Sequence, residues 1–136
     1  MSIESARLIY PILVRLARES AQAAQVKQTL PWTTYEDLCL KCKDVGVKET
    51  ARTIATKLLK PIQLACLEAN HPDLTALVIQ KPKARGDIGN LIRPSDGWWE
   101  IYVQRGEISA AGDVPFWFER YRKARDYQEW PEAPFF

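Results

Sequence analysis

The sequence predicts an α+β fold in which helices come first, a β-hairpin with a long basic loop follows, and a C-terminal helix comes last. Three patterns carry this prediction. Apolar residues recur at spacings of three and four through the first half, two short runs at 74–80 and 98–104 are β-branched or aromatic, and helical spacing returns at 116–130. We expect one domain over 1–136, with the segment 113–136 packed on the rest.

Length and composition fit a folded domain and leave its partner open. The chain has 136 residues, of which 46% are hydrophobic and 26% charged, so it can bury a core and is not expected to be disordered. Lys and Arg number 19 against 17 Asp and Glu, and a net charge of +2 neither requires nor excludes a polyanionic partner. The clustering of the cations is therefore the informative property.

The protein is expected to be cytoplasmic and to have no membrane segment. Residues 1–20 carry charges through their apolar stretch and lack the basic start of a secretory signal. No run approaches the roughly 18 apolar residues of a membrane span. Three cysteines, an odd number in a chain of this size, favour reduced thiols.

The first and the last helix of the chain are predicted from the spacing of apolar residues alone. The first is predicted at 5–25, and Pro11 either kinks it or lies in its first turn. The last is predicted at 116–130. Its inward side chains are expected to be Phe116, Trp117, Tyr121 and Ala124.

A short helix is predicted at 34–43. Pro31 stops the segment before it, and Thr33 with Glu36 three residues later forms a capping box. The inner face of this helix carries Tyr35, Leu38, Cys39 and Cys42.

A longer helix is predicted at 47–70, after a tight turn that Gly46 closes. Pro61 is expected to kink or split it, because proline removes one hydrogen bond and crowds the carbonyl of Lys57. The outer face of this helix carries Lys48, Arg52, Thr53, Thr56, Lys57 and Lys60.

The two predicted strands, LTALVIQ at 74–80 and WWEIYVQ at 98–104, would flank a long exposed connection at 81–97. This connection is rich in Gly and Pro and exceeds the usual hairpin loop of about two to five residues. Long loops that a small domain retains often carry function.

This order of elements is that of a winged helix-turn-helix. The runs ILVRLA, TTYEDL and LEANHPDLTALVIQK resemble a winged-helix-like domain of uncharacterised phage, mobile-element and defence-associated proteins. The resemblance covers about residues 5–104. It implies the fold and no particular activity, and the loop RGDIGNLIRPSDG is longer and more basic than the pattern of that group.

Cysteine and histidine residues raise the question of a metal site. Cys39, Cys42, Cys66 and His71 are of types that bind zinc. The first two, however, lie on the apolar face of a predicted helix, where a free Cys packs as a small hydrophobic residue, so no metal is expected. His71 is expected to cap the end of the preceding helix rather than to act in catalysis.

No catalytic site is expected. The acidic residues around the predicted hairpin lack the lysine that accompanies the carboxylates of many nuclease metal sites. The sequence also has no phosphate-binding Gly-rich loop and no serine nucleophile elbow. We therefore expect a non-enzymatic protein that needs no cofactor and no small-molecule substrate.

Two predicted elements carry an excess of cations, and in a winged helix both would face DNA. Double-stranded DNA is therefore the first predicted partner. The alternative is that these cations form the ordinary solvated face of an amphipathic helix. The predicted contacts are Lys48, Arg52, Thr53, Thr56, Lys57 and Lys60 from the helix, and Lys83, Arg85 and Arg93 from the loop.

Aromatic residues are concentrated near the C-terminus. In a strand at 98–104, Trp98 and Trp99 would point to opposite faces, so one of them would be exposed. That side chain, with Phe135 and Phe136, would offer an apolar surface to a protein partner or to a second copy in a homodimer. The alternative is that the C-terminal helix covers these residues.

Two functional hypotheses follow. The first is a non-enzymatic DNA-binding winged-helix protein, such as a regulator. The alternative is a protein-interaction module of phage or mobile-element origin that binds or inhibits a host protein.

Overall fold

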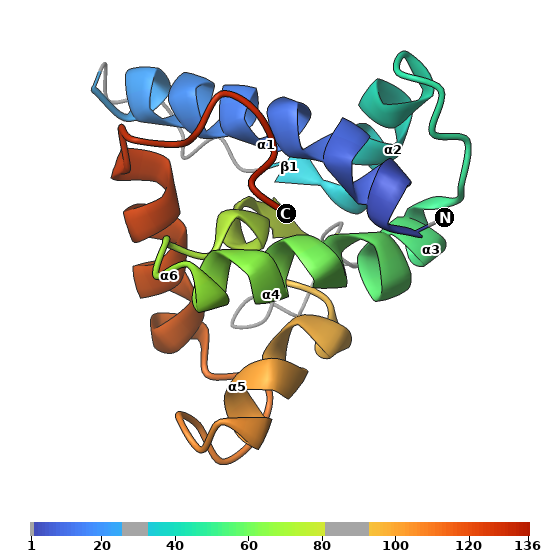
Figure 1. Ribbon diagram of the computed structural model, residues 1–136. Helices are drawn as coiled ribbons and strands as arrows, with labels where there is room; N and C mark the ends of the chain where they lie inside the picture. Colours follow the sequence, from blue (N-terminus) through green and yellow to red (C-terminus); the bar gives the residue numbers. More distant parts are fainter. Residues whose placement is uncertain (1, 26–32, 81–92) are drawn as a thin grey trace, which may run out of the picture.

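The computed structural model describes residues 2–25, 33–80 and 93–136, and most of these lie in helices (Figure 1). The elements follow the order α1 (Ser2–Gln25), β1 (Thr33–Thr34), α2 (Tyr35–Lys43), α3 (Ala51–Thr53), η1 (Ile54–Leu58), α4 (Leu59–Glu68), η2 (Leu74–Leu77), β2 (Val78–Ile79), η4 (Asp96–Trp99), α5 (Glu100–Gln104) and α6 (Val114–Asp126). The segment η1 is a π-helix, whereas η2 and η4 are 3-10 helices.

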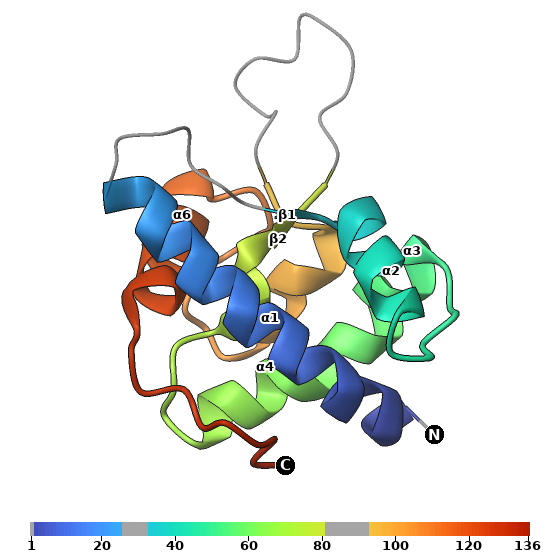
Figure 2. The ribbon, with the colours of Figure 1, turned by 90° about the horizontal axis from the view of Figure 1, so that it is seen from above.

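The sheet has two short parallel strands within the described residues. Thr33 pairs with Val78, and Thr34 with Ile79. The prediction of an α+β winged-helix fold with a β-hairpin is therefore wrong: the described part of the chain is mainly helical and shows no hairpin ladder. Gln80 donates its backbone N–H to the carbonyl of Arg93 at 2.8 Å, so the segment after β2 and the segment before η4 lie side by side (Figure 2). The residues between 81 and 92 lie outside the described part.

Both predicted strands contain helical turns instead. At 74–77, the carboxylate of Asp73 accepts the backbone N–H of Thr75 and begins a 3-10 turn, so only Val78 and Ile79 remain extended. At 98–104, the buried residues follow helical spacing rather than alternation. They are Trp98, Trp99, Ile101 and Tyr102.

The first helix, α1, is longer than predicted and continues through Pro11. Pro11 lies well inside the helix and is exposed, so it is not in the first turn. The buried side of α1 faces α4, η2 and α6. Figure 1 shows α1 and α4 side by side, with α6 crossing at one end of both.

The short helix α2 begins one residue later than the predicted capping box. Thr34, not Thr33, caps it by accepting the backbone N–H of Asp37 at 3.1 Å. Thr33 is instead paired with Val78 in the sheet. At the other end Gly46 has a φ of +86°, which confirms the predicted turn.

The next helical stretch runs from α3 through η1 into α4, and Pro61 shapes it. Because Pro61 has no N–H, the carbonyl of Lys57 has no donor at the usual position four residues on. The turn just before it widens to the π form, in which Leu59 donates its N–H to Ile54. The predicted disturbance at Pro61 thus takes the form of a π turn.

The end of α4 is closed by backbone groups. Asn70 adopts a φ of +60°, and the N–H of His71 donates to the carbonyl of Cys66 at 2.8 Å. His71 therefore lies at the end of α4, and its backbone N–H contributes to the cap. Its imidazole does not contribute to the cap. Its Nδ1 lies 3.0 Å from the hydroxyl oxygen of Tyr127.

The C-terminal region packs on the first helix and on η2. Trp117 of α6 donates its indole N–H to the carbonyl of Ala76 at 2.9 Å. The hydroxyl of Tyr10 in α1 donates to the carbonyl of Pro131 at 2.6 Å, and Phe135 meets the same ring edge to face. The predicted helix at 116–130 is shifted in the structure, because Asp113 caps it and it ends at Asp126.

No helix in the described ranges combines the length and the apolar character needed to cross a membrane.

The turn after α2 gives a test of this backbone. Replacing Gly46 with Ala is expected to lower the free energy of unfolding by about 1 kcal/mol, because an L side chain is strained at this φ. A Cβ at position 46 meets no atom within 4 Å, so the loss would come from the backbone alone.

The matched control is Gly97→Ala, since a Cβ there also meets no atom within 4 Å and its φ is not left-handed. This variant is expected to gain about 0.5 kcal/mol through a less flexible unfolded chain. Urea unfolding measures both changes, and equal losses in the two variants would contradict the assignment of strain to Gly46.

Candidate functional site

Three of the cations predicted to contact DNA lie exposed on one stretch of the chain. Lys48 belongs to the turn before α3, Arg52 to α3 and Lys57 to η1. Within the described ranges, none of these three side chains forms an ion pair or a hydrogen bond. They are therefore available to an anionic partner.

The two threonines of the predicted DNA face have local roles. The hydroxyl of Thr53 lies 3.1 Å from that of Thr50, the residue that caps α3. Thr56 donates its hydroxyl to the carbonyl of Arg52 at 2.8 Å. Base recognition by either hydroxyl would require these contacts to be exchanged.

The remaining predicted contacts are divided. Lys60 Nζ lies 3.2 Å from Glu100 Oε1, and Arg93 Nη2 lies 3.2 Å from Asp96 Oδ1. Both cations are thus paired with carboxylates of the chain itself. Lys83 and Arg85 lie outside the described residues, so Arg93 is the predicted loop cation that the structure places.

The ion pairs are distributed unevenly. In the part of the chain that the structure describes, every ion pair uses a cation at position 60 or later. The cations on α1, α2, α3 and η1 have no carboxylate partner there. Most of the described cations without a carboxylate contact therefore lie in the N-terminal half, and Arg122 of α6 is the exception.

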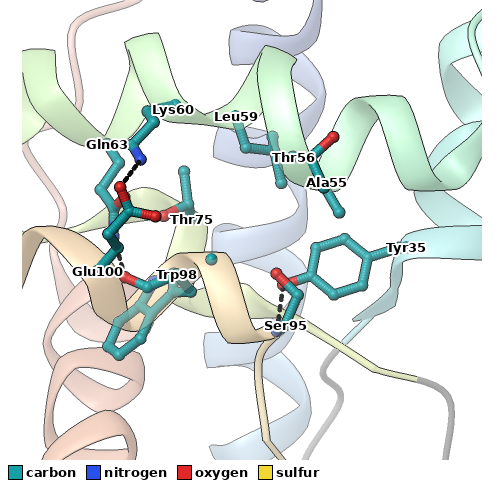
Figure 3. A pocket seen from close by; sticks show the side chains of 11 residues that line it. Tyr35, Ala55, Thr56, Leu59, Lys60, Gln63, Thr75, Ser95, Trp98 and Glu100 are labelled. Atoms are coloured by element: carbon teal, nitrogen blue, oxygen red, sulfur yellow. Dashed lines mark hydrogen bonds and ion pairs between the residues drawn. The ribbon is translucent and has the colours of Figure 1, made fainter. Parts of the chain in front are cut away.

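A pocket of about 160 Å³ lies between η1 and α4 on one side and η4 and α5 on the other (Figure 3). The ion pair of Lys60 and Glu100 spans one end of it. At the other end, Tyr35 accepts the backbone N–H of Ser95 at 2.9 Å. Thr56 and Lys60, two residues predicted to contact DNA, line this pocket.

A buried carboxylate lies behind the pocket. Asp73 accepts hydrogen bonds from Gln63 Nε2 at 3.1 Å, from the Tyr102 hydroxyl at 2.7 Å, and from the backbone and hydroxyl of Thr75. Gln63 Nε2 also donates to the carbonyl of Trp98 at 3.0 Å. Both amide hydrogens of Gln63 are thereby used, and Gln63 also lines the pocket.

Burial dominates the electrostatics of this group. Loss of water around the carboxyl raises the pKa of Asp73, and the hydrogen bonds from Thr75, Tyr102 and Gln63 oppose that rise only in part. Burial, together with the nearby Asp73, also raises the pKa of Tyr102. Tyr102 therefore stays a hydroxyl that can donate.

Sequence reasoning missed this network. The spacing of Asp73 and Thr75 is a local signal, because Asp often accepts the backbone N–H two residues on. Nothing in the sequence indicates that Gln63 and Tyr102 join them.

The predicted aromatic anchors for a partner do not form one exposed surface. Trp98 is 5% exposed and Trp99 is fully buried, so the expectation that one of them faces solvent is wrong. The reason is the helical turn, which places both indoles on the inner side. Phe135 and Phe136 are half-buried and pack on Tyr10.

Two of the three thiols are buried, and Cys39 is half-buried. Burial raises the pKa of Cys42 to about 11 and that of Cys66 to about 12. Cys39 directs its Sγ to the carbonyl of Glu49 at 3.3 Å. No three His, Cys, Asp or Glu side chains in the described ranges gather as metal ligands would.

The chain matches no family model, no curated protein and no solved structure. The resemblance to the winged-helix group rests on the sequence pattern alone.

The buried carboxyl of Asp73 predicts a pH dependence of stability. Its pKa is higher in the folded state than in the unfolded chain, where a carboxyl titrates near pH 4. The folded state therefore binds the proton more tightly, and the free energy of unfolding should fall as pH rises from about 4 to the folded pKa. Above that pKa the contribution is constant.

Urea unfolding over about pH 4 to 8 tests this prediction. Asp73→Asn should abolish that decline, and Tyr102→Phe should extend it to higher pH because one hydrogen bond to the carboxylate is lost. An Asn variant with the wild-type pH profile would contradict the assignment.

Proposed function

We propose that the protein is a non-enzymatic DNA-binding protein that contacts phosphates of the duplex through Lys48, Arg52 and Lys57. The observation that carries the proposal is that these cations are exposed along one stretch and have no counter-charge in the described residues. Phosphate is the anion that a row of such side chains suits, since its binding releases condensed counterions.

The local backbone supports this proposal without a wing. The helix α2 contacts α3 across the turn at Gly46, so two helices are joined as in a helix-turn-helix. In that motif the first residues of the second helix approach the bases, and Arg52 lies in this position. A guanidinium there can contact guanine with two hydrogen bonds, while Lys48 and Lys57 supply charge to the backbone.

The surface next to these residues shares the uncompensated charge. Lys41 and Lys43 end α2, and neither forms an ion pair within the described ranges. Glu49 lies between Lys48 and Arg52 but is half-buried. Along residues 41–57 the exposed cations therefore outnumber the exposed carboxylate of Asp44.

Charge reversal of Arg52 and Lys57 tests the proposal. The double variant Arg52→Glu, Lys57→Glu is expected to lose duplex binding by at least about 100-fold, and single Ala variants to reduce the salt slope by about 0.9 each. The measurement is fluorescence anisotropy with labelled duplex DNA over a range of salt concentrations.

The matched control is Arg122→Glu, Lys123→Glu, which removes the same charge from α6 (Figures 1 and 2 show α3 and α6 at opposite ends). This variant is expected to retain most of the affinity. Absence of wild-type binding at low salt, or an equal loss in the control, would disprove the proposal.

The ion pair at the pocket gives a gain-of-function prediction. Glu100→Gln releases Lys60, so duplex binding is expected to tighten and the salt slope to steepen by up to about 0.9. Stability should change little, because an exposed pair contributes little to folding. Glu132→Gln, which removes an exposed charge from the tail, is the control, and an equal gain in both variants would assign the effect to net charge alone.

A further inference from the structure

A second surface lies between α1 and the end of α2. It is a groove of about 320 Å³ with walls from both helices and the turn after α2. Leu8 on one wall is 47% exposed and Val45 on the other is 40% exposed. Exposed apolar side chains on two elements that border one groove are the arrangement into which the apolar face of a partner helix packs.

The apolar side of the groove that α1 forms has a defined length. Leu8, Ile12 and Leu16 are spaced by four residues and form one stripe along α1. At 1.5 Å per residue, the stripe extends for about 12 Å, or roughly two helical turns. A segment that lies along it could insert two or three side chains at helical spacing.

Cations border this stripe. Arg7 and Arg15 precede its first and last leucines, and Lys41 faces them from α2. None of the three forms an ion pair in the described ranges, although Arg7 donates its Nε–H to the carbonyl of Phe136. Glu19 and Asp44 are the acidic residues of the lining, so cations are in excess.

We propose that this groove binds an acidic amphipathic helix of a partner protein. Apolar residues of that helix would cover Leu8 and Val45, and its carboxylates would meet Arg15 and Lys41. Charge complementarity favours this occupant over a second copy, because the groove of each copy carries three cations against two carboxylates. The groove shares Lys41 with the exposed cations of residues 41–57 but contains neither Arg52 nor Lys57, so the proposal does not depend on DNA binding.

The test uses the full chain and two fluorescein-labelled synthetic helices of about 16 residues, a length that can sustain a helix. The first has Leu at positions i, i+4 and i+7 with Glu on both flanks. The second has Lys in place of every Glu. Anisotropy is expected to show at least about tenfold tighter binding of the acidic helix.

Two variants locate the binding. Leu8→Asp and Arg15→Glu are each expected to weaken the acidic helix about tenfold. Both side chains are exposed enough to be replaced without loss of the fold, which thermal unfolding checks. Val103→Asp is the control, because Val103 is an exposed apolar residue of α5 away from the groove.

Four results would overturn the proposal. The first is equal binding of the two synthetic helices, and the second is wild-type binding by both groove variants. The third is a dimer in light scattering that Leu8→Asp converts to a monomer, since a second copy would then occupy the groove. The fourth is a loss of duplex DNA binding in Leu8→Asp, because the groove would then belong to the DNA surface.

Discussion

The carboxylate of Asp73 accepts hydrogen bonds from segments that are far apart in the sequence. Gln63 belongs to α4, Thr75 to η2 and Tyr102 to α5. A buried donor that loses its acceptor costs about 1 to 3 kcal/mol, so this one group constrains three elements at once. Gln63 extends the constraint to the carbonyl of Trp98, which fixes η4 against α4. The separation of the two pocket walls, and with it the reach of Lys60 to Glu100, depends on this arrangement.

The π turn before Pro61 shapes the same region, because η1 forms part of one pocket wall. A π turn contains more backbone than an α-helical turn. The side chains within it and after it face different surroundings. Lys57 remains exposed, whereas Lys60 turns to the carboxylate of Glu100. A helix that appears uniformly basic in sequence is thus divided into a free part and a neutralised part.

The helices α1, α2 and α4 could be predicted because their apolar spacing and caps are local. The start of α2 was missed by one residue, since the pairing of Thr33 with Val78 depends on a strand more than 40 residues away in the sequence. The hairpin was wrong because composition favoured strands at 74–80 and 98–104, while Asp73 capped one segment and helical burial of Trp98 and Tyr102 decided the other.

The candidate surfaces were also predictable only where the signal is local in the sequence. The exposure of Lys48, Arg52 and Lys57 follows from helical periodicity. The pairing of Lys60 with Glu100 does not, because it joins residues 40 positions apart. The groove beside Leu8 was also hidden, since Leu8 fits an apolar helix and only the packing of α2 shows that it stays uncovered.

The contacts of α1 have a consequence for how the chain folds. This helix is made early, yet Tyr10 finds its hydroxyl partner at Pro131, which is 121 residues further on, and α6 completes its packing. Contacts of such long range are slow to form because the loop entropy is lost before the contact contributes. The part of the apolar side of α1 that α6 covers therefore stays exposed until residues 114–126 have been synthesised. Removal of α6 would leave this side of α1 exposed and prone to aggregation.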